Sequence, residues 1–421
     1  MSNGKPGTLV AFIYVTTLFF AWGFVTSTID PLVASVKGVF HLSFAEAMLT
    51  QFAWFIAYGV TSLPAAAILS KLGFPNAIIT ALATMVTGCL IIPAATSMDF
   101  YPGILLGLFV IASGVTLLQV AANPLAAALG SPERSHFRLT LSQTFNSFGT
   151  WIGPIIGASI MLHGGVFNGA EPDAAARAQS LRAIDTNFLI VGAFFALVGL
   201  FIWTARKRID AAAPPHEKAA SPFLAFKSGW ALFGAFAIFV YVGSEVTIGS
   251  LMTNFLHQGS ILNIALEDAG KMVGLYWMGA MIGRFLGSLA FFVKTPAGIL
   301  LSIAALIAAG MCLFVSQNAG TTAAYVALSI GFFNSIMFPA IFTLTLERSS
   351  APTSATSGLL CMAIIGGAVL PFIAGKIVDM GSFGPAFFVP MLGYIGVAAF
   401  AISAARSKPA QAGAVAAEAF H

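Results

Sequence analysis

The sequence predicts an all-α membrane protein with twelve transmembrane helices, arranged as two halves of six helices each. Of its 421 residues, 58% are apolar and only 8% are charged, whereas a soluble domain carries about 25% charged residues. Long stretches exclude charge altogether, and residues 295–346 contain no Asp, Glu, Lys or Arg. Three pairs of chemically matched residues also recur at one offset, which indicates two related halves.

Apolar stretches define the spans of the first half, because about 20 apolar residues cross the hydrocarbon core as a helix. The first stretch follows MSNGKPG without a small-residue cleavage pattern, so we expect a retained helix and not a signal peptide. Residues 165–185 are polar enough for an outside loop, with a short surface helix expected at 172–184. The expected spans are 8–29, 47–70, 74–96, 102–129, 138–163 and 186–205.

The second half divides in the same way, and its long uncharged block breaks at the polar turn signal SQNAG, residues 316–320. The expected spans are 229–256, 270–292, 296–316, 320–346, 353–376 and 383–405. Between the halves, RKRIDAAAPPHEKAASPFLAFKS is the most charged stretch of the chain. We therefore expect an N-terminal six-helix bundle at 1–205, a cytoplasmic linker at 206–228 and a C-terminal six-helix bundle with a short cytoplasmic tail at 229–421.

The loop charges predict the orientation, because Lys and Arg are enriched on the cytoplasmic side. With the N-terminus inside, the inside segments hold 14 of these residues and the outside segments 5. We expect both termini in the cytoplasm and the chain in a bacterial-type inner membrane. The net charge of +4 is too small and scattered to indicate nucleic acid, and the three cysteines lie in apolar spans. No metal site and no cofactor are expected.

The internal repeat has an offset of 215 residues and couples rare residue types in corresponding spans. A parallel repeat of six plus six spans is typical of the major facilitator architecture, with its substrate site near the bilayer midplane between the halves. We expect the two prolines of the repeat to have gating or structural roles. The matched pairs are Asp30 with Glu245, Gln119 with Asn334, and Pro124 with Pro339.

Three ionisable residues lie within or at the end of uncharged spans, where a charge costs about 2.5–3.5 kcal/mol on insertion scales. Asp30 shares a helical face with Ser27 and is a candidate proton carrier, because burial favours a neutral carboxyl; an interfacial acid is the alternative. Glu245 is either a second coupling acid or a structural acid bonded to a neighbouring helix. Arg284 is expected to pair with a carboxylate or to cap a helix, a structural or gating role.

Carboxamides cluster in two consecutive spans. Gln119 and Asn123 are four residues apart, and Gln143 and Asn146 are three apart, so each pair shares a helical face. Carboxamides donate and accept hydrogen bonds, as a polyhydroxylated ligand requires, and interhelical hydrogen bonding is the alternative. Pro124 frees a backbone carbonyl beside the first pair. The other candidate ligand contacts are Ser27, Asn334, Trp22 and Tyr241.

Several segments resemble the fucose:proton symporter family, and within it the glucose/galactose transporter branch. The span four to span five block, LLQVAANPLAAALG followed by HFRLTLSQTFNSFGTWIGP, is the most specific of them. The similarity covers nearly the whole chain. The other segments are LFFAWGFVTSTIDPL in span one, YVGSEVTIGS in span seven and GRFLG in span eight.

The resemblance implies a major facilitator fold that imports a hexose with a cation by alternating access. Asp30 matches the family's membrane acid implicated in proton coupling, and Gln143 and Asn146 match polar cavity residues. Gln119 stands where fucose permease has a glutamate, and the glucose/galactose branch has glutamine there. Ser27 stands where fucose permease has an asparagine. The difference at Gln119 weakens an assignment to fucose itself and removes one of two candidate protonation sites.

We therefore expect a monomeric secondary active transporter that imports a glucose- or galactose-like hexose through the lipid bilayer by cation symport. A proton is the expected coupling ion, and sodium is the alternative. The residues also leave open an amino sugar such as N-acetylglucosamine, and efflux in place of import. A non-transporting membrane sensor is a weaker alternative, because no loop is long enough for a soluble output domain. An enzyme is not expected, because the sequence has no metal cluster and no nucleophile–base pair.

Overall fold

A computed structural model of the chain describes residues 7–42, 44–162, 174–215, 220–381 and 383–409. The described residues form α-helices and short 3-10 helices, and no strand. They group into two compact units. Unit 1 comprises Met1–Leu129 and Phe145–His216, and unit 2 comprises Gly130–Thr144 and Glu217–His421.

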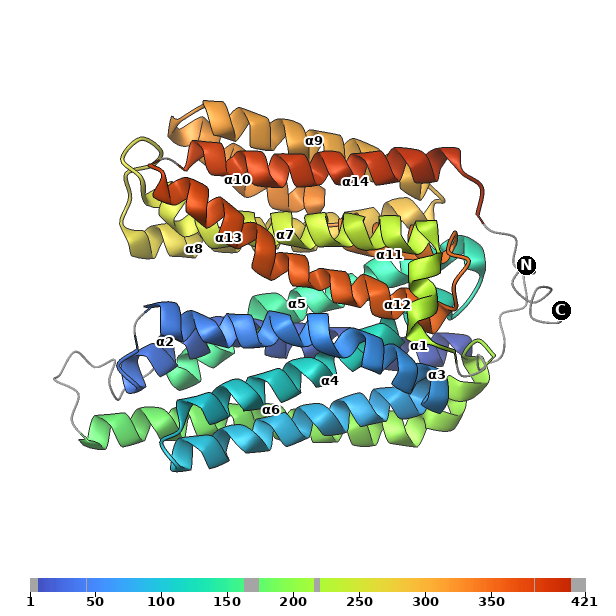
Figure 1. Cartoon of the computed structure of the whole chain (residues 1–421), viewed down its shortest axis with the longest axis horizontal. Helices are drawn as coiled ribbons and strands as arrows, with labels where there is room; N and C mark the ends of the chain where they lie inside the picture. Colours follow the sequence, from blue (N-terminus) through green and yellow to red (C-terminus); the bar gives the residue numbers. More distant parts are fainter. Residues whose placement is uncertain (1–6, 43, 163–173, 216–219, 382, 410–421) are drawn as a thin grey trace. The chain divides into compact units, whose positions relative to one another are not determined.

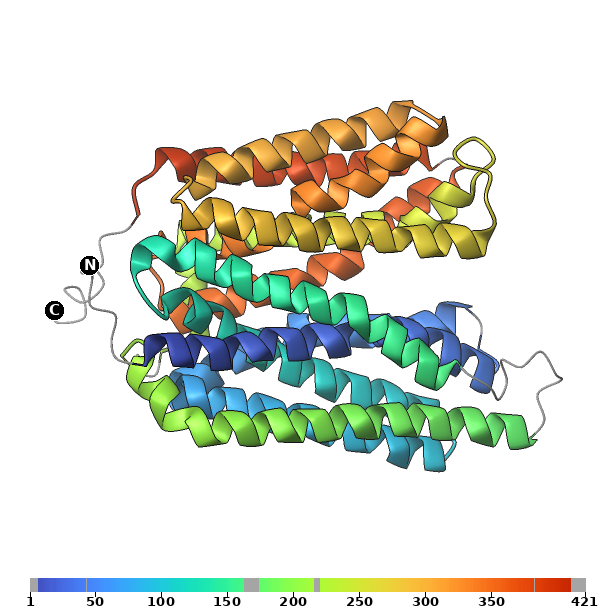
Figure 2. The same ribbon diagram turned by 180° about the vertical axis from the view of Figure 1, so that it is seen from behind.

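Unit 1 is a helical bundle in which α3 packs against both α4 and α6. Figure 2 shows α6 as a long helix of this unit. Non-helical dihedral angles at Gly73 (φ 73°, ψ 172°) divide α3 into two arms, and only glycine adopts this conformation readily. The break confirms the expected boundary between the second and third spans. The helices are α1 (Thr8–Ser27), α2 (Ile29–Val39), α3 (Phe44–Ser97), α4 (Tyr101–Ala128), the C-terminal part of α5 (Ser135–Met161) and α6 (Ala174–Ala212).

Unit 2 contains the N-terminal part of α5 and the described helices that follow α6. Two of its passes are interrupted: α10 (Gly320–Asn334) is followed by α11 (Met337–Leu346), and α12 (Thr353–Met362) is followed by η4 (Ala363–Ile365) and α13 (Gly366–Asp379). The uninterrupted helices are α7 (Gly229–His257), α8 (Leu266–Phe292), α9 (Ala297–Gln317) and α14 (Phe388–Arg406). Helix α14 packs on α9 and α7, and α8 packs on α10 (Figure 1). The short 3-10 helices are η1 (Pro132–Arg134), η3 (Pro222–Lys227) and η5 (Gly384–Phe387).

The helices account for the twelve expected passes. Ten helical segments of the described chain are long and apolar enough to cross a membrane. One of them contains both arms of α3, and α5 adds a further pass of 27 residues. Many large apolar side chains on these helices are exposed, Leu197 and Leu200 of α6 among them. Such a surface suits contact with hydrocarbon, because soluble monomers rarely expose large contiguous apolar patches.

Two boundaries differ from the sequence expectation. The surface helix expected at 172–184 is continuous with the sixth span, because α6 begins at Ala174. The same helix continues to Ala212, seven residues into the segment expected to be a linker from residue 206. Residues 174–212 contain no proline, and their two glycines, Gly192 and Gly199, lie within the apolar part of the helix. Nothing in the local sequence therefore ends the helix at the edge of the apolar stretch.

The interiors of the units are apolar and include all three cysteines. Cys89 of unit 1 and Cys312 and Cys361 of unit 2 are free and buried. Cys89 lies opposite Gly192 of α6, where an added Cβ would stand 3.0 Å from the Cys89 Cβ. The absence of a side chain at this position therefore permits the close approach of α6 and α3.

Candidate functional site

The first amide pair lies inside unit 1 on α4. Gln119 is buried, and its Nε2 donates to the hydroxyl oxygen of Tyr58 on α3 at 2.8 Å. Asn123, one turn later, is fully buried. Pro124 is also buried, and α4 continues through it to Ala128. The contact with Tyr58 holds the Gln119 amide in one orientation, which is the condition for selective hydrogen bonding to a ligand.

The second amide pair divides between the units at the middle of α5. Asn146 belongs to unit 1, and its Nδ2 donates to the carbonyl oxygen of Phe19 on α1 at 3.0 Å. Gln143 is buried and belongs to unit 2. The observed bond of Asn146 is interhelical, as the alternative interpretation of these amides expects.

Ser27 lies where α1 meets α5. Its hydroxyl is 3.0 Å from the carbonyl oxygens of both Gly23 and Phe24. A Cβ at Gly153 of α5 would overlap this hydroxyl, and a Cβ at Gly149 would stand 2.8 Å from the Phe24 nitrogen. Small residues on α5 thus allow the backbones to approach closely, as in membrane helix pairs generally. The Ser27 hydroxyl therefore donates within α1 and lies against Gly153 of α5.

Two further candidates of unit 1 have different outcomes. Trp22 is buried, with its ring centroid 4.1 Å from that of Phe19, which is a packing arrangement. Asp30 is the second residue of α2, directly after the interruption that separates α1 from α2. Its side chain is outside those that the structure describes. Its role in coupling therefore stays a prediction.

Unit 2 contains a buried ion pair. Arg284 of α8 points its Nη2 at Oε1 of Glu245 on α7, 3.3 Å away, and the two side chains are only 11% and 13% exposed. The buried Tyr241, one turn before Glu245, interacts electrostatically with both. Removal of one partner of such a pair costs about 3–5 kcal/mol, because the other charge is left buried and uncompensated. The expectation that Arg284 pairs with a carboxylate is met by Glu245.

A third contact of Arg284 reaches the interruption between α10 and α11. Its Nε donates to the carbonyl oxygen of Ser335 at 3.0 Å. In an uninterrupted helix this carbonyl would accept from the backbone nitrogen four residues later. That residue is Pro339, which has no N–H. Pro339 therefore leaves the Ser335 carbonyl without its helical donor, and the Arg284 guanidinium donates to this carbonyl instead.

Asn334 is the last residue of α10 and is fully buried. Its Nδ2 donates to the hydroxyl oxygens of Tyr276 at 2.7 Å and Tyr394 at 3.0 Å. Its Oδ1 is buried without a hydrogen-bond partner among the described residues. The Tyr276 hydroxyl in turn donates to the backbone carbonyl of Glu245 at 3.3 Å. One polar network thus joins α7, α8, α10 and α14.

A second polar cluster of unit 2 surrounds His136 at the start of α5. His136 Nε2 lies 3.1 Å from Glu347 Oε1, and the Ser135 hydroxyl donates to the same oxygen at 3.1 Å. His136 Nδ1 also contacts the hydroxyl of Thr343. Burial alone would raise the pKa of Glu347, but the hydrogen bond and charge of His136 and the charge of Arg348 bring this pKa below its usual value.

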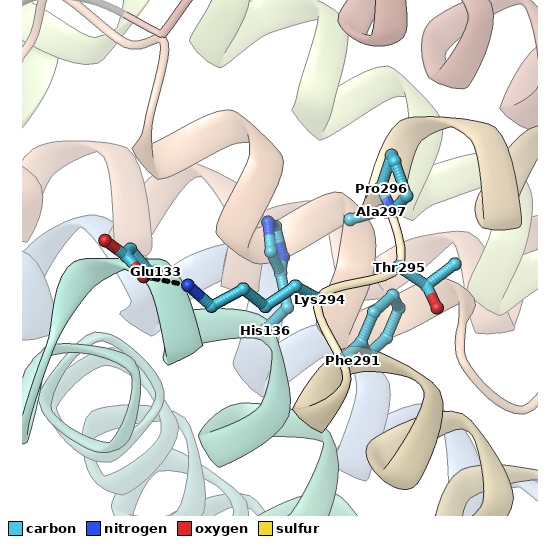
Figure 3. A pocket seen from close by; sticks show the side chains of 7 residues that line it. All are labelled: Glu133, His136, Phe291, Lys294, Thr295, Pro296 and Ala297. Carbon is cyan, nitrogen blue, oxygen red and sulfur yellow. Dashed lines mark hydrogen bonds and ion pairs between the residues drawn. The ribbon is translucent and has the colours of Figure 1, made fainter.

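Figure 3 shows the exposed side of this cluster, a pocket in which Lys294 reaches toward Glu133 while His136 and Phe291 stand beside it. The Lys294 Nζ lies 2.5 Å from Glu133 Oε2. This hydrogen bond and charge hold the pKa of Glu133 below its usual value. Both side chains are well exposed, so the pair is screened by solvent.

Sequence reasoning missed several of these residues. The tripeptide Glu-Arg-Ser occurs at 133–135 and again at 347–349, and this second internal repeat would have indicated that the two segments are related. Tyr276 and Tyr394 carried no motif, and their roles depend on contacts across three helices. Among the described residues, no group of three His, Cys, Asp or Glu side chains could hold a metal ion.

The fold defines a multi-pass helical membrane protein, and the buried polar network of α7, α8, α10 and α14 is of the kind that marks substrate or ion pathways in transporters. Comparison with known proteins gives the family. Residues 11–359 match the family described as the Major Facilitator Superfamily. The chain belongs to this superfamily.

Individual relatives match over nearly their full length. The glucose/galactose transporter of Brucella abortus (strain 2308) is 37% identical over 400 residues, covering 93% of each chain. The L-fucose-proton symporter of Escherichia coli K12 is 30% identical over 416 residues, covering 93% of this chain and 92% of that one. The crystal structure of the E. coli fucose:proton symporter matches with a TM-score of 0.84 and 25% identity, covering 95% and 100% of the two chains.

Proposed function

We propose that this protein is a secondary active transporter that imports a glucose- or galactose-like hexose together with a proton. The observation that carries the proposal is the 37% identity, over 93% of both chains, to a protein named glucose/galactose transporter. The buried amides of α4 and α10 support it, because carboxamides can both donate to and accept from sugar hydroxyls. The relatives named L-fucose-proton symporters favour a proton over sodium as the coupling ion.

In the proposed cycle, the carrier exposes its sugar site alternately to the outside and to the inside. Gln119, oriented by Tyr58, and Asn334, oriented by two tyrosines, would each present an amide to the sugar. Asp30 would bind the proton. Neutralising this acid lowers the cost of enclosing it in a low-dielectric site, so a loaded carrier closes more readily than one with a charged, empty site.

Glu245 and Arg284 form the corresponding charged site of unit 2, where the ion pair needs no external ion to balance its charge. We therefore assign the coupling step to Asp30 and not to Glu245. The proposal includes a monomer in the bacterial inner membrane with both termini in the cytoplasm. The excess of Lys and Arg in the inside loops supports this orientation.

The decisive experiment is uptake of labelled glucose, galactose, fucose and N-acetylglucosamine into proteoliposomes. An inward proton gradient and an inward sodium gradient are imposed in separate preparations, each with an ionophore control that dissipates it. We expect accumulation of glucose or galactose under the proton gradient alone. Accumulation under the sodium gradient alone would show that sodium, and not a proton, is the coupling ion. No uptake of any of the four sugars would refute the proposed substrate class.

A further inference from the structure

The interruption between α10 and α11 is held from outside its own helix. The Ser335 carbonyl has lost its helical donor to Pro339 and accepts instead from Arg284 Nε at 3.0 Å. Arg284 uses a different nitrogen, Nη2, for Glu245. One rigid guanidinium therefore joins the charge on α7 to the backbone of the interruption. Lysine cannot reproduce this arrangement, because its ammonium is a point charge on a flexible stem and lacks the planar fork.

Glycines bring α8 close enough for this contact. A Cβ at Gly283 would overlap the Phe332 carbonyl and the Ser335 hydroxyl, and a Cβ at Gly287 would overlap the Ile336 side chain. Both glycines flank Arg284 in the GRFLG segment. The α8 face beside Arg284 is therefore shaped to the interruption itself.

The residue before the interruption is Asn334, whose amide nitrogen is held by Tyr276 and Tyr394. Its Oδ1 is fully buried and has no partner among the described residues. An unsatisfied buried acceptor costs about 1–3 kcal/mol, so this oxygen is poised to accept a hydrogen bond. Any movement of the Ser335 peptide would displace the Asn334 side chain, because the two residues are adjacent in the chain.

We propose that Arg284 is a positioning residue for sugar recognition: by holding the Ser335 carbonyl it fixes the α10–α11 interruption, and with it the acceptor oxygen of Asn334 that binds a sugar hydroxyl. This inference rests on the proposed function. Arg284 itself does not contact the sugar. Its ion pair with Glu245 keeps the guanidinium charge compensated while Nε performs the positioning.

Two single variants and their combination test the proposal. Arg284→Lys keeps a positive charge near Glu245 but removes the fixed donor to Ser335. Pro339→Ala supplies a backbone N–H that competes with Arg284 for the same carbonyl and straightens the interruption. Each is expected to raise the Kd for the transported sugar about tenfold, the loss of one charge-assisted hydrogen bond, with the maximal rate of counterflow preserved.

The double variant separates positioning from general destabilisation. If both substitutions act through the Ser335 carbonyl, Arg284→Lys adds little to the Kd of Pro339→Ala, whereas independent effects would multiply. Arg348→Lys is the matched control, because Arg348 is also buried and also bonds a carbonyl, that of Ala404. We expect it to lower the unfolding temperature without changing the Kd.

Hydrogen exchange gives a readout that is independent of sugar. Exchange of the backbone amides of residues 332–342 should accelerate in Arg284→Lys and slow in Pro339→Ala. A wild-type Kd in both single variants, or multiplied effects in the double variant, would overturn the positioning role. If the wild-type protein binds none of the four sugars, the proposed function fails and the sugar role of Arg284 fails with it. Sugar binding by the wild type with an unchanged Kd in Arg284→Lys refutes the positioning role alone.

Discussion

His136 Nε2 and Glu347 Oε1 lie 3.1 Å apart, which joins the start of α5 to the end of α11. Glu347 begins one copy of the Glu-Arg-Ser repeat, and His136 directly follows the other copy. Residues 130–144 group with unit 2, yet the chain continues from both ends of this segment into unit 1. The contact therefore anchors the start of α5 to the end of α11 within unit 2.

Glu347→Gln should lower the stability of the folded protein and should make that stability less sensitive to a fall in pH. The pKa of Glu347 is lowered in the folded protein, so its contribution is present above the ordinary glutamate pKa of about 4.3 and is lost as pH falls below it. At pH 7 we expect the unfolding temperature to drop by about 2 °C, for a contact of about 1 kcal/mol. Between pH 5 and 3 the variant should lose less stability than the wild type. Thermal unfolding in detergent followed by fluorescence measures both effects.

Glu133→Gln is the control for this experiment. Its pKa is also lowered, by Lys294, but the pair is exposed to solvent and its contribution is screened. We expect no measurable change in the unfolding temperature. An equal drop in both variants would mean that net charge, and not the contact with His136, sets the stability of this region.

Gly153→Ala should disrupt the packing of α1 on α5. A Cβ at this position would overlap the Ser27 hydroxyl and stand 2.5 Å from the Phe24 carbonyl oxygen, which is backbone and cannot easily move. Overpacking of this kind costs about 1–3 kcal/mol. Gly157→Ala, one turn later, is matched to it, because its Cβ would meet neighbours at ordinary contact distances of 3.4 Å or more. Detergent unfolding temperatures should fall for the first variant and hold for the second; equal values would contradict the packing described.

Tyr58→Phe should weaken sugar binding without affecting coupling. The substitution removes the hydroxyl that accepts from Gln119 Nε2 at 2.8 Å and leaves the buried amide free to rotate. We expect the KM for hexose uptake to rise about fivefold, corresponding to about 1 kcal/mol. Tyr325→Phe, at an exposed position on α10, should leave the KM unchanged. A normal KM in Tyr58→Phe would show that the Gln119 orientation does not matter for the sugar.

Asp30→Asn should abolish accumulation driven by a proton gradient and retain counterflow exchange of sugar. The amide imitates the protonated acid, so the loaded carrier still closes, but no proton can be bound or released. Proteoliposome uptake and counterflow are measured on the same preparation. Asp268→Asn, an exposed acid at the start of α8, should accumulate sugar normally. Accumulation against a gradient by Asp30→Asn would place the coupling group elsewhere.

The passes of the fold were predictable because exclusion of charge from a bilayer leaves a simple pattern of lengths. The break at Gly73 coincides with the expected boundary between two spans. Lys71 ends the apolar run, and Gly73, two residues later, breaks the helix. The end of α6 was not predictable from the same rule. Hydropathy reports where the membrane ends, whereas a helix continues until something stops it, and nothing does so before Ala212.

The candidate site was predictable in composition but not in pairing. Their charge within apolar spans identified Glu245 and Arg284, and spacing identified Gln119 and Asn334, as residues that need polar partners within a bundle. Neither signal says which residue on a neighbouring helix is the partner. Arg284 and Glu245 are 39 positions apart, and Asn334 and Tyr394 are 60. The sequence alone could have located the freed carbonyl, because it lies four residues before Pro339. Its hydrogen bond from Arg284, however, depends on glycines that let α8 approach.

The burial of all three cysteines gives this transporter a practical advantage. Cys89, Cys312 and Cys361 have no access to water in this structure, and maleimides react with the solvated thiolate. The natural chain is therefore already a nearly silent background for thiol-specific reagents. Single cysteines introduced along α4, α10 or α11 could be read one at a time for access from either side of the membrane, without first removing native residues and disturbing the packing that they complete.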